Sequence, residues 1–348
     1  MHRPWTAGVL AALAALGTSQ AALAGDEEVN LQQEYVPEEA QGGEQERQGV
    51  DWRINTGLTI SFNDNRSVVG QPDGSTLVFG YKFDGGIDWR REGHELRNSL
   101  GVQASLTQTP TVDRLTKASD ELRFESIYLY HIVDWFGPFV QFKLDTTTLP
   151  GMDHRAELTT YNIALLDGAQ QQVVADRLHL TDSFAPLKLK ESAGAFFQPV
   201  SEEPYSLEFR IGAGGRETFA EGQRAVDDDA DTPEIEVKEL DDVLQFGAEA
   251  VAEFWGALYQ KKVTYKLGAE VMFPVATNQA DDDDRNALEL ANLEFRGNLS
   301  FKLVEWASLD YQFKALREPQ LIDAFQIQNN LLLTFGLATG SAPPEKAE

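Results

Sequence analysis

The sequence predicts an all-β protein, a transmembrane antiparallel up-and-down β-barrel of about 12 strands with short periplasmic turns and long extracellular loops. Three observations lead to this fold class. Apolar and polar residues alternate over segments that are long for strands. Tight and long connections alternate along the chain. Aromatic residues gather at the tight-turn ends of the segments.

The alternation is clearest in residues 50–63, VDWRINTGLTISFN, where Trp52 and Leu58 share one parity and Asp51 and Arg53 the other. Successive strand side chains point to opposite faces, so the segment has one apolar and one polar face. It exceeds the roughly 5–6 residues of an ordinary strand, and tilted strands of about 9–11 residues cross the apolar part of a bilayer. In hydrocarbon every backbone polar group must be paired, which requires a closed barrel.

Further segments of the same kind follow along the chain. With the first one they are 50–63, 77–90, 95–106, 121–132, 136–145, 187–197, 205–215, 244–254, 263–273, 293–303, 307–315 and 325–337. The connections near 92–94, 133–134, 201–204, 256–258 and 304–305 are tight, whereas most of the others are long. An even strand count with this alternation is typical of bacterial outer-membrane barrels, with turns in the periplasm and loops outside.

The ends of the chain predict export and flexible extensions. Residues 1–24 have the charged, apolar and small-residue parts of a cleaved signal peptide. Residues 25–49 are Glu/Gln-rich and are expected to form a disordered acidic periplasmic arm. The barrel is expected over 50–337 and a flexible C-terminal tail over 338–348. The chain has no Cys, so a disulfide framework is excluded.

Aromatic residues on the apolar parity predict a membrane girdle near the short turns, because amphipathic rings favour the headgroup region. These residues are Trp52, Trp89, Tyr130, Phe136, Phe197, Tyr205, Phe254, Phe301, Trp306 and Phe335. Glu191 is the one violation, since it shares parity with the apolar residues Leu187 and Phe197. We expect a bulge, a kink or a break in register near it.

Charged residues on the opposite parity are expected to line the lumen, with the two signs nearly balanced. They are Arg53, Lys82, Asp84, Arg97, Glu121, Arg123, Glu125, Lys143, Asp145, Glu208, Arg210, Lys266, Glu270, Glu294 and Arg296. One interpretation is a paired network that fills a narrow barrel, because unpaired buried charges are costly. The other is a wet channel with a transverse field, as in porins. The filled or narrow lumen is favoured.

The function expected from the residues is passive: a narrow porin-like channel or a structural barrel, with no catalysis and no cofactor. The net charge of −27 disfavours nucleic acid as a partner. Expected partners are outer-membrane lipid and lipopolysaccharide, the outer-membrane assembly machinery and small solutes. Location in the bacterial outer membrane follows from the barrel and the signal peptide.

Two alternatives stay open. The first is a lipid or ester hydrolase with its site in the 148–184 loop, where His179 has hydroxyl and carboxylate neighbours such as Ser183 and Asp182. The second is a surface binding protein that uses acidic loops. The run 281–284 is all Asp, but it lacks the spacing of a calcium loop, so a solvated run is favoured over weak, non-specific binding of divalent cations, and no metal site is assigned. The 148–184 loop also contains Asp167-Gly168, which favours a hairpin.

Two further stretches carry a resemblance. The segment FQIQNNLLLTFGL, residues 325–337, resembles the C-terminal strand that the outer-membrane assembly machinery recognises, although an aromatic residue normally ends that strand and Leu337 stands here. Residues 120–146, DELRFESIYLYHIVDWFGPFVQFKLDT, together with SLEFRIGAGGRETF, are similar to a family of uncharacterised outer-membrane barrels. The resemblance covers most of the barrel and implies the fold; it implies no mechanism.

Overall fold

The computed structural model describes residues 49–65, 74–109, 114–202, 204–227, 232–278, 285–286, 288–304, 306–320 and 322–340. The expected signal peptide, nearly all of the expected acidic arm and residues 341–348 of the expected tail lie outside these ranges. Within them every regular element is a β-strand. A search of this part of the chain for a helix long and apolar enough to span a membrane finds none.

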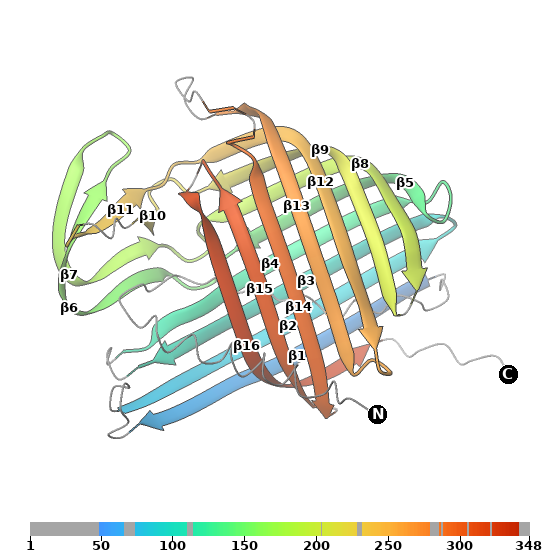
Figure 1. Ribbon diagram of the computed structural model, residues 1–348, viewed down its shortest axis with the longest axis horizontal. Helices are drawn as coiled ribbons and strands as arrows, with labels where there is room; N and C mark the ends of the chain where they lie inside the picture. The colour runs from blue at the N-terminus through green and yellow to red at the C-terminus, as the bar shows by residue number, and fades with distance from the viewer. Residues whose placement is uncertain are drawn as a thin grey trace, which may run out of the picture. The chain divides into compact units, whose positions relative to one another are not determined.

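Twelve strands form one closed barrel in the order β1-β16-β15-β14-β13-β12-β9-β8-β5-β4-β3-β2 (Figure 1). All neighbours are antiparallel. The predicted fold class is therefore confirmed. The barrel strands are β1 (Gly49–Asn65), β2 (Gly74–Arg91), β3 (His94–Gln108), β4 (Thr116–Tyr130), β5 (Phe136–Thr146), β8 (Leu187–Glu202), β9 (Tyr205–Phe219), β12 (Val243–Leu258), β13 (Val263–Thr277), β14 (Asn292–Val304), β15 (Ala307–Glu318) and β16 (Ile322–Gly340).

A separate four-stranded sheet occupies two of the long connections. Its strands are β6 (Gly151–Ala164), β7 (Gln170–Thr181), β10 (Arg224–Val226) and β11 (Ile235–Glu239), in the order β10-β11-β6-β7. β6 and β7 form the hairpin expected around Asp167-Gly168, and Gly168 has the positive φ of 83° that such a turn requires. β11 pairs with β6 in parallel.

The small sheet has its own apolar core, made by alternate residues of three strands. Tyr161 and Ile163 of β6, Leu178 and Leu180 of β7 and Val237 of β11 are buried together. The hairpin that carries the residues of β6 and β7 was expected from the sequence, whereas the segment around Val237 was expected to be part of a long acidic loop. The sheet therefore extends the predicted loops into an ordered element that is not part of the barrel wall.

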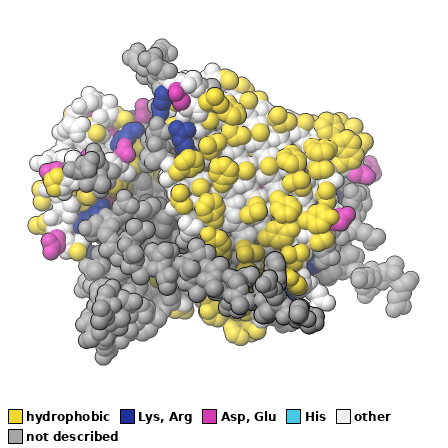
Figure 2. Space-filling model, viewed as in Figure 1, with side chains coloured by type: hydrophobic (Ala, Val, Ile, Leu, Met, Phe, Trp, Pro, Cys, Tyr) yellow, Lys and Arg dark blue, Asp and Glu magenta, His cyan; other side chains and the backbone are white. Residues whose placement is uncertain are grey.

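The barrel exposes apolar side chains on its outer wall, where Figure 2 shows them over the long strands. Trp52 is 41% exposed and Leu58 49% exposed, whereas Arg53, next to Trp52, is only partly exposed and Gly57, next to Leu58, is buried. An apolar surface of this extent is unfavourable in water, but it matches the apolar band of a membrane barrel. The barrel strands thus turn their apolar faces outward.

The strand around Glu191 is regular, contrary to the bulge, kink or break in register expected there. Glu191 lies in an unbroken part of β8, opposite Phe142 on one side and Gly215 on the other. The expected irregularity near it is absent among the described residues of this strand, where the register shifts between Phe197 and Val200 instead. Glu191 keeps the outward parity of β8 and is exposed. The strand therefore carries a carboxylate on its lipid face.

The C-terminal boundary also differs from the expectation. β16 continues through Gly340, which pairs with Arg53 of β1. Residues 338–340, expected in the tail, are part of the barrel wall. Residues 338–340 remain in the strand because their backbone pairs with β1, and this ladder closes the barrel.

Candidate functional site

The candidate site is the barrel interior, where the polar parity of each strand points. Of the predicted lumen-lining residues, nine are buried: Lys82, Asp84, Glu121, Arg123, Lys143, Glu208, Arg210, Glu270 and Glu294. The other six are partly buried: Arg53, Arg97, Glu125, Asp145, Lys266 and Arg296. Because β-strand side chains alternate, each strand places its charged residues on the same inner face.

Glu270 of β13 is the meeting point of three cations from three other strands. Lys143 Nζ of β5 lies 3.3 Å from Oε2, and Lys190 Nζ of β8 lies 3.3 Å from Oε1. Arg216 of β9 also donates to Oε1. All four side chains are buried, and they link strands that are not adjacent in the barrel. The network therefore crosses the lumen.

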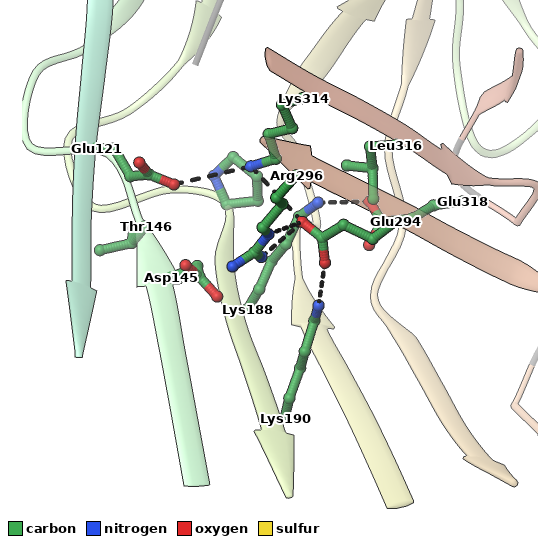
Figure 3. A pocket seen from close by; sticks show the side chains of 11 residues that line it. Glu121, Asp145, Thr146, Lys188, Lys190, Glu294, Arg296, Lys314, Leu316 and Glu318 are labelled. Carbon is green, nitrogen blue, oxygen red and sulfur yellow. Dashed lines mark hydrogen bonds and ion pairs between the residues drawn. The ribbon is translucent and has the colours of Figure 1, made fainter. Parts of the chain in front are cut away.

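Glu294 of β14 forms a second centre beside the first. It accepts from Lys190 Nζ at 2.9 Å and from Arg296 at 2.5 Å, and Lys314 Nζ lies 3.9 Å away. Lys314 Nζ also lies 3.8 Å from Glu121 of β4, on another part of the wall. Figure 3 shows these side chains converging from several strands.

The pocket among these charges is small. Four cations and four carboxylates, with Thr146, Pro186 and Leu316, surround a cavity volume of about 30 Å³. A buried water needs roughly 10–15 Å³ on this scale, so the space holds about two waters. The space that these side chains enclose is therefore only large enough for a few waters.

A third group of charges lies in the half of the barrel that is nearer the short turns. Glu208 of β9 accepts from Arg97 at 3.1 Å and from Arg210 at 2.5 Å. Arg210 also lies 3.3 Å from Glu253, which pairs with Lys266 at 3.3 Å. The bond from Arg97 joins β3 to β9 across the interior.

An apolar cluster accompanies this group near the short turns. Ile127 and Leu129 of β4, Phe139 of β5 and Phe196 of β8 are buried together on inward-facing positions. His131, which follows β4, stacks its ring edge-on against Phe196 at 4.9 Å between centroids. A cluster of this type inside a lumen excludes water and narrows the passage.

His131 connects the cluster to the charged network. Its Nε2 lies 2.8 Å from Glu95 Oε2, and its Nδ1 lies 3.1 Å from the carbonyl oxygen of Asp134. The hydrogen bond to Glu95 raises the pKa of His131 above its ordinary value, against the opposing effect of burial. The imidazole lies in a periplasmic turn, outside the spanning strands.

One pair of charges was missed in the sequence. Lys188 Nζ of β8 lies 2.5 Å from Glu318 Oε2 of β15. Lys188 has the same parity as Lys190, so the alternation could have indicated it. Glu318 lies beyond residue 315, where the apolar alternation of that segment stops, and no local signal marks it.

The predicted girdle residues are exposed or partly exposed on the outer wall. Several contact one another near the short turns: Phe197 stacks on Phe209, Trp306 on Phe335, and Phe254 lies 5.2 Å from Tyr265 between ring centroids. Trp135, in the turn before β5, meets Phe197 edge-on and was not among the predicted residues.

Among the described residues around His179, an ion pair is present, but no hydrogen bond joins the imidazole to a hydroxyl group. His179 Nε2 lies 3.3 Å from Asp182 Oδ1, but both side chains are at least half exposed. The Thr181 hydroxyl accepts from the backbone N–H of Gly151 instead of meeting the imidazole. Asp176 pairs with Arg114. A nucleophile and its base must lie within hydrogen-bond reach, and no such bond joins Ser183 to His179 in this described loop.

Two further expectations concern acidic segments. The Asp run 281–284 lies outside the described residues, as do residues 228–231 of the other acidic run. In the part of the chain that the structure describes, no group of three or more His, Asp or Glu side chains is arranged to hold a metal ion.

Comparisons with known proteins find fold similarity and no close relative. No family model matches the chain, and no curated protein matches it. An outer-membrane channel from Pseudomonas putida F1 is 11% identical with a TM-score of 0.39, covering 88% of this chain and all of that one. The β domain of the Bordetella autotransporter Brka is 11% identical with a TM-score of 0.32, covering 84% and 99%. The translocator domain of the autotransporter NalP from Neisseria meningitidis is 10% identical with a TM-score of 0.33, covering 84% and 87%.

The arrangement of the strands and the polarity of their two faces indicate where the protein is located in the cell. Twelve antiparallel strands close into a barrel with an apolar outer wall and a charged interior. This arrangement pairs the backbone within the wall and presents hydrocarbon to lipid, which is the architecture of bacterial outer-membrane proteins. The chain is a β-barrel of the bacterial outer membrane.

Proposed function

We propose that the protein is a narrow, passive channel whose lumen is closed at rest by ion pairs that cross it. The observation that carries this proposal is the set of bonds between non-adjacent strands: Arg97 to Glu208, Lys143 and Lys190 to Glu270, and Lys314 to Glu121. The cavity between these groups holds about two waters, which supports a passage at this level that is narrower than that of a porin.

The chemistry of the filling favours a channel over a permanently solid barrel. A buried ion pair is often no more stabilising than apolar residues of the same volume, because its desolvation cost offsets the attraction. Unlike apolar side chains, the partners of an ion pair can separate and become hydrated when an ion enters the lumen or when a voltage is applied across the membrane. A lumen filled by salt bridges therefore keeps the capacity to conduct.

Planar-bilayer recording tests the proposal. We expect the refolded protein to show small conductance steps, and Arg97→Ala to raise them at least about threefold because the bond to Glu208 no longer crosses the lumen. Arg114→Ala is the matched control, since Arg114 pairs with Asp176 in the exposed part outside the barrel. Equal conductance of both variants, or silence of all three proteins, would contradict the proposal.

A further inference from the structure

The seam between the first and last strands is closed along only part of its length. β1 and β16 form ladder pairs from Arg53↔Gly340 to Leu58↔Phe335. Both strands continue beyond this point, since β1 runs to Asn65 and β16 begins at Ile322. In the described residues 59–65 and 322–334, no ladder pair joins the two strands.

The strands remain paired on their other sides, so only the facing edges are free of a ladder. β1 pairs with β2 up to Asn65↔Gly74, and β16 pairs with β15 from Glu318↔Ile322 onward. β1 leads into a long connection, so the incomplete half lies on the extracellular side. Figure 1 shows where β1 and β16 lie in the wall.

The two strands pack closely just before the last ladder pair, Leu58↔Phe335. Gly57 lies opposite Gly336, and a Cβ on Gly336 would stand 2.6 Å from the carbonyl oxygen of Thr56, so the two backbones meet closely there. Inside, Asp310 of β15 accepts from Thr334 of β16 at 2.8 Å and lies 3.9 Å from Lys82 of β2. These contacts connect β16 and β15 on one side of the seam to β2 on the other, at the inner end of the opening.

The two faces of the opening differ in polarity. Ile60 of β1 and Ile327, Leu331 and Leu333 of β16 are exposed on the outer wall. Toward the interior lies the charged pocket, with Lys314 of the adjacent strand β15 on its wall. A molecule that fits the opening must therefore offer hydrocarbon outward and polar groups inward.

Backbone chemistry leads to the same requirement. A free strand edge presents a row of N–H and C=O groups, and each unsatisfied group costs several kcal/mol in hydrocarbon. The groups along the opening need hydrogen-bonding partners at a depth where the outer neighbours are acyl chains. A lipid headgroup with its own acyl chain supplies both.

We infer that the extracellular half of the β1–β16 seam is a lateral binding slot for an acyl-chain amphiphile of the outer leaflet. Its headgroup hydrogen-bonds to the strand edges and reaches toward the charged pocket, and its chain stays in the bilayer beside Ile60 and Leu333. The slot ends at the last ladder pair, Leu58↔Phe335, so the amphiphile enters from the outer leaflet and does not cross to the periplasm.

Cysteine pairs test whether the seam is open, because the natural chain has no Cys. Thr56→Cys with Leu337→Cys lies within the ladder and is expected to form a disulfide under mild oxidation. Ile60→Cys with Leu333→Cys would be the corresponding pair if the ladder continued, and is expected to stay reduced. Disulfide formation to the same extent in both pairs would overturn the inference.

Fluorescence quenching tests the occupant. A fluorophore on Thr59→Cys lies on the inward parity at the slot, whereas one on Asn55→Cys lies on the same face within the closed ladder. In vesicles that contain phosphatidylcholine with a nitroxide on its headgroup, we expect at least threefold stronger quenching at residue 59. Equal quenching at both positions would overturn the inference, as would a disulfide-linked dimer of Ile60→Cys alone, which would assign the edges to a second copy.

Discussion

Glu270 has three cationic partners in the central network. Its carboxylate is shared by Lys143, Lys190 and Arg216. Removing one member of a buried ion pair leaves an uncompensated charge and costs roughly 3–5 kcal/mol. We therefore expect Glu270→Gln to lower the free energy of unfolding by about 3 kcal/mol.

Urea unfolding in lipid vesicles, followed by tryptophan fluorescence, measures this effect. The control is Glu157→Gln, because Glu157 is exposed on β6 in the small sheet, away from the barrel network. If both substitutions changed the free energy of unfolding equally, the ion pairs of Glu270 would contribute no more to stability than an exposed carboxylate does.

His131 makes a pH-dependent contribution at the periplasmic turn. Its pKa is raised in the folded protein by the hydrogen bond to Glu95, so the stability that it contributes is complete below its ordinary pKa of about 6.5. This stability is lost as the pH rises through the raised pKa. We expect the wild type to exceed His131→Gln in unfolding free energy by about 1–2 kcal/mol at pH 5.5, with the difference shrinking as the pH rises through the raised pKa of His131. A difference that grows with pH would contradict this assignment.

The interior residues show how far a single-residue pattern reaches. The parity of each strand alone predicts that Lys143, Glu208 and Glu294 lie on the inner face, and all three are buried there. Which of them meet across the lumen depends on strand order and stagger, which no local pattern encodes. Glu318 lies past the end of its alternation, and its bond to Lys188 is visible only in the folded barrel.

At the scale of the element, β8 tolerates a carboxylate on the lipid face. Glu191 keeps its outward parity because both neighbouring strands hold the register, opposite Phe142 and Gly215. Charges on this face are destabilising to a degree that depends on depth, and less for Glu than for Lys. We expect Glu191→Leu to stabilise the barrel by about 1 kcal/mol and Glu191→Lys to destabilise it by about 1–2 kcal/mol.

Equilibrium unfolding in vesicles tests both substitutions against Glu202→Leu, at the short-turn end of the same strand, where Glu202 is exposed. An unfolding free energy of Glu191→Leu below that of the wild type would indicate that the carboxylate makes a stabilising contact.

The small sheet marks the limit of element prediction. The Asp167-Gly168 turn indicated the β6–β7 hairpin, because this dipeptide favours a positive φ. The partnership of β11 with β6 could not be predicted, because it joins residues far apart in the chain through a parallel ladder. The strands β10 and β11 are also so short that their alternation of apolar and polar residues cannot be distinguished from the sequence of an acidic loop.

At the scale of the whole molecule, closure makes the barrel behave as one unit in detergent. A closed ladder resists dodecyl sulfate until it is heated, since no strand edge is available over the paired part. We expect the unboiled protein to migrate faster in gel electrophoresis than the boiled one. Gly336→Val is expected to lose this difference at a lower temperature, because its side chain would collide with the carbonyl oxygen of Thr56.

Gly268→Val provides the matched control for that substitution. A Cβ on Gly268 would have its nearest neighbour at 3.9 Å, so the strand has room for a side chain. Loss of heat-modifiable migration at the same temperature in both variants would contradict the role given to the seam.

The central claim is that the apolar sides of the strands face lipid and the charged sides face one another. Spin labels placed one at a time along residues 205–219 of β9 test it most directly, through collisions with oxygen in lipid and with a polar nickel chelate in water. We predict that oxygen accessibility peaks at positions such as 209 and 211, where Phe209 and Ile211 are exposed, and falls at 208 and 210, where Glu208 and Arg210 are buried. The opposite phase, with labels at 208 and 210 in lipid and those at 209 and 211 shielded from oxygen, would contradict the account.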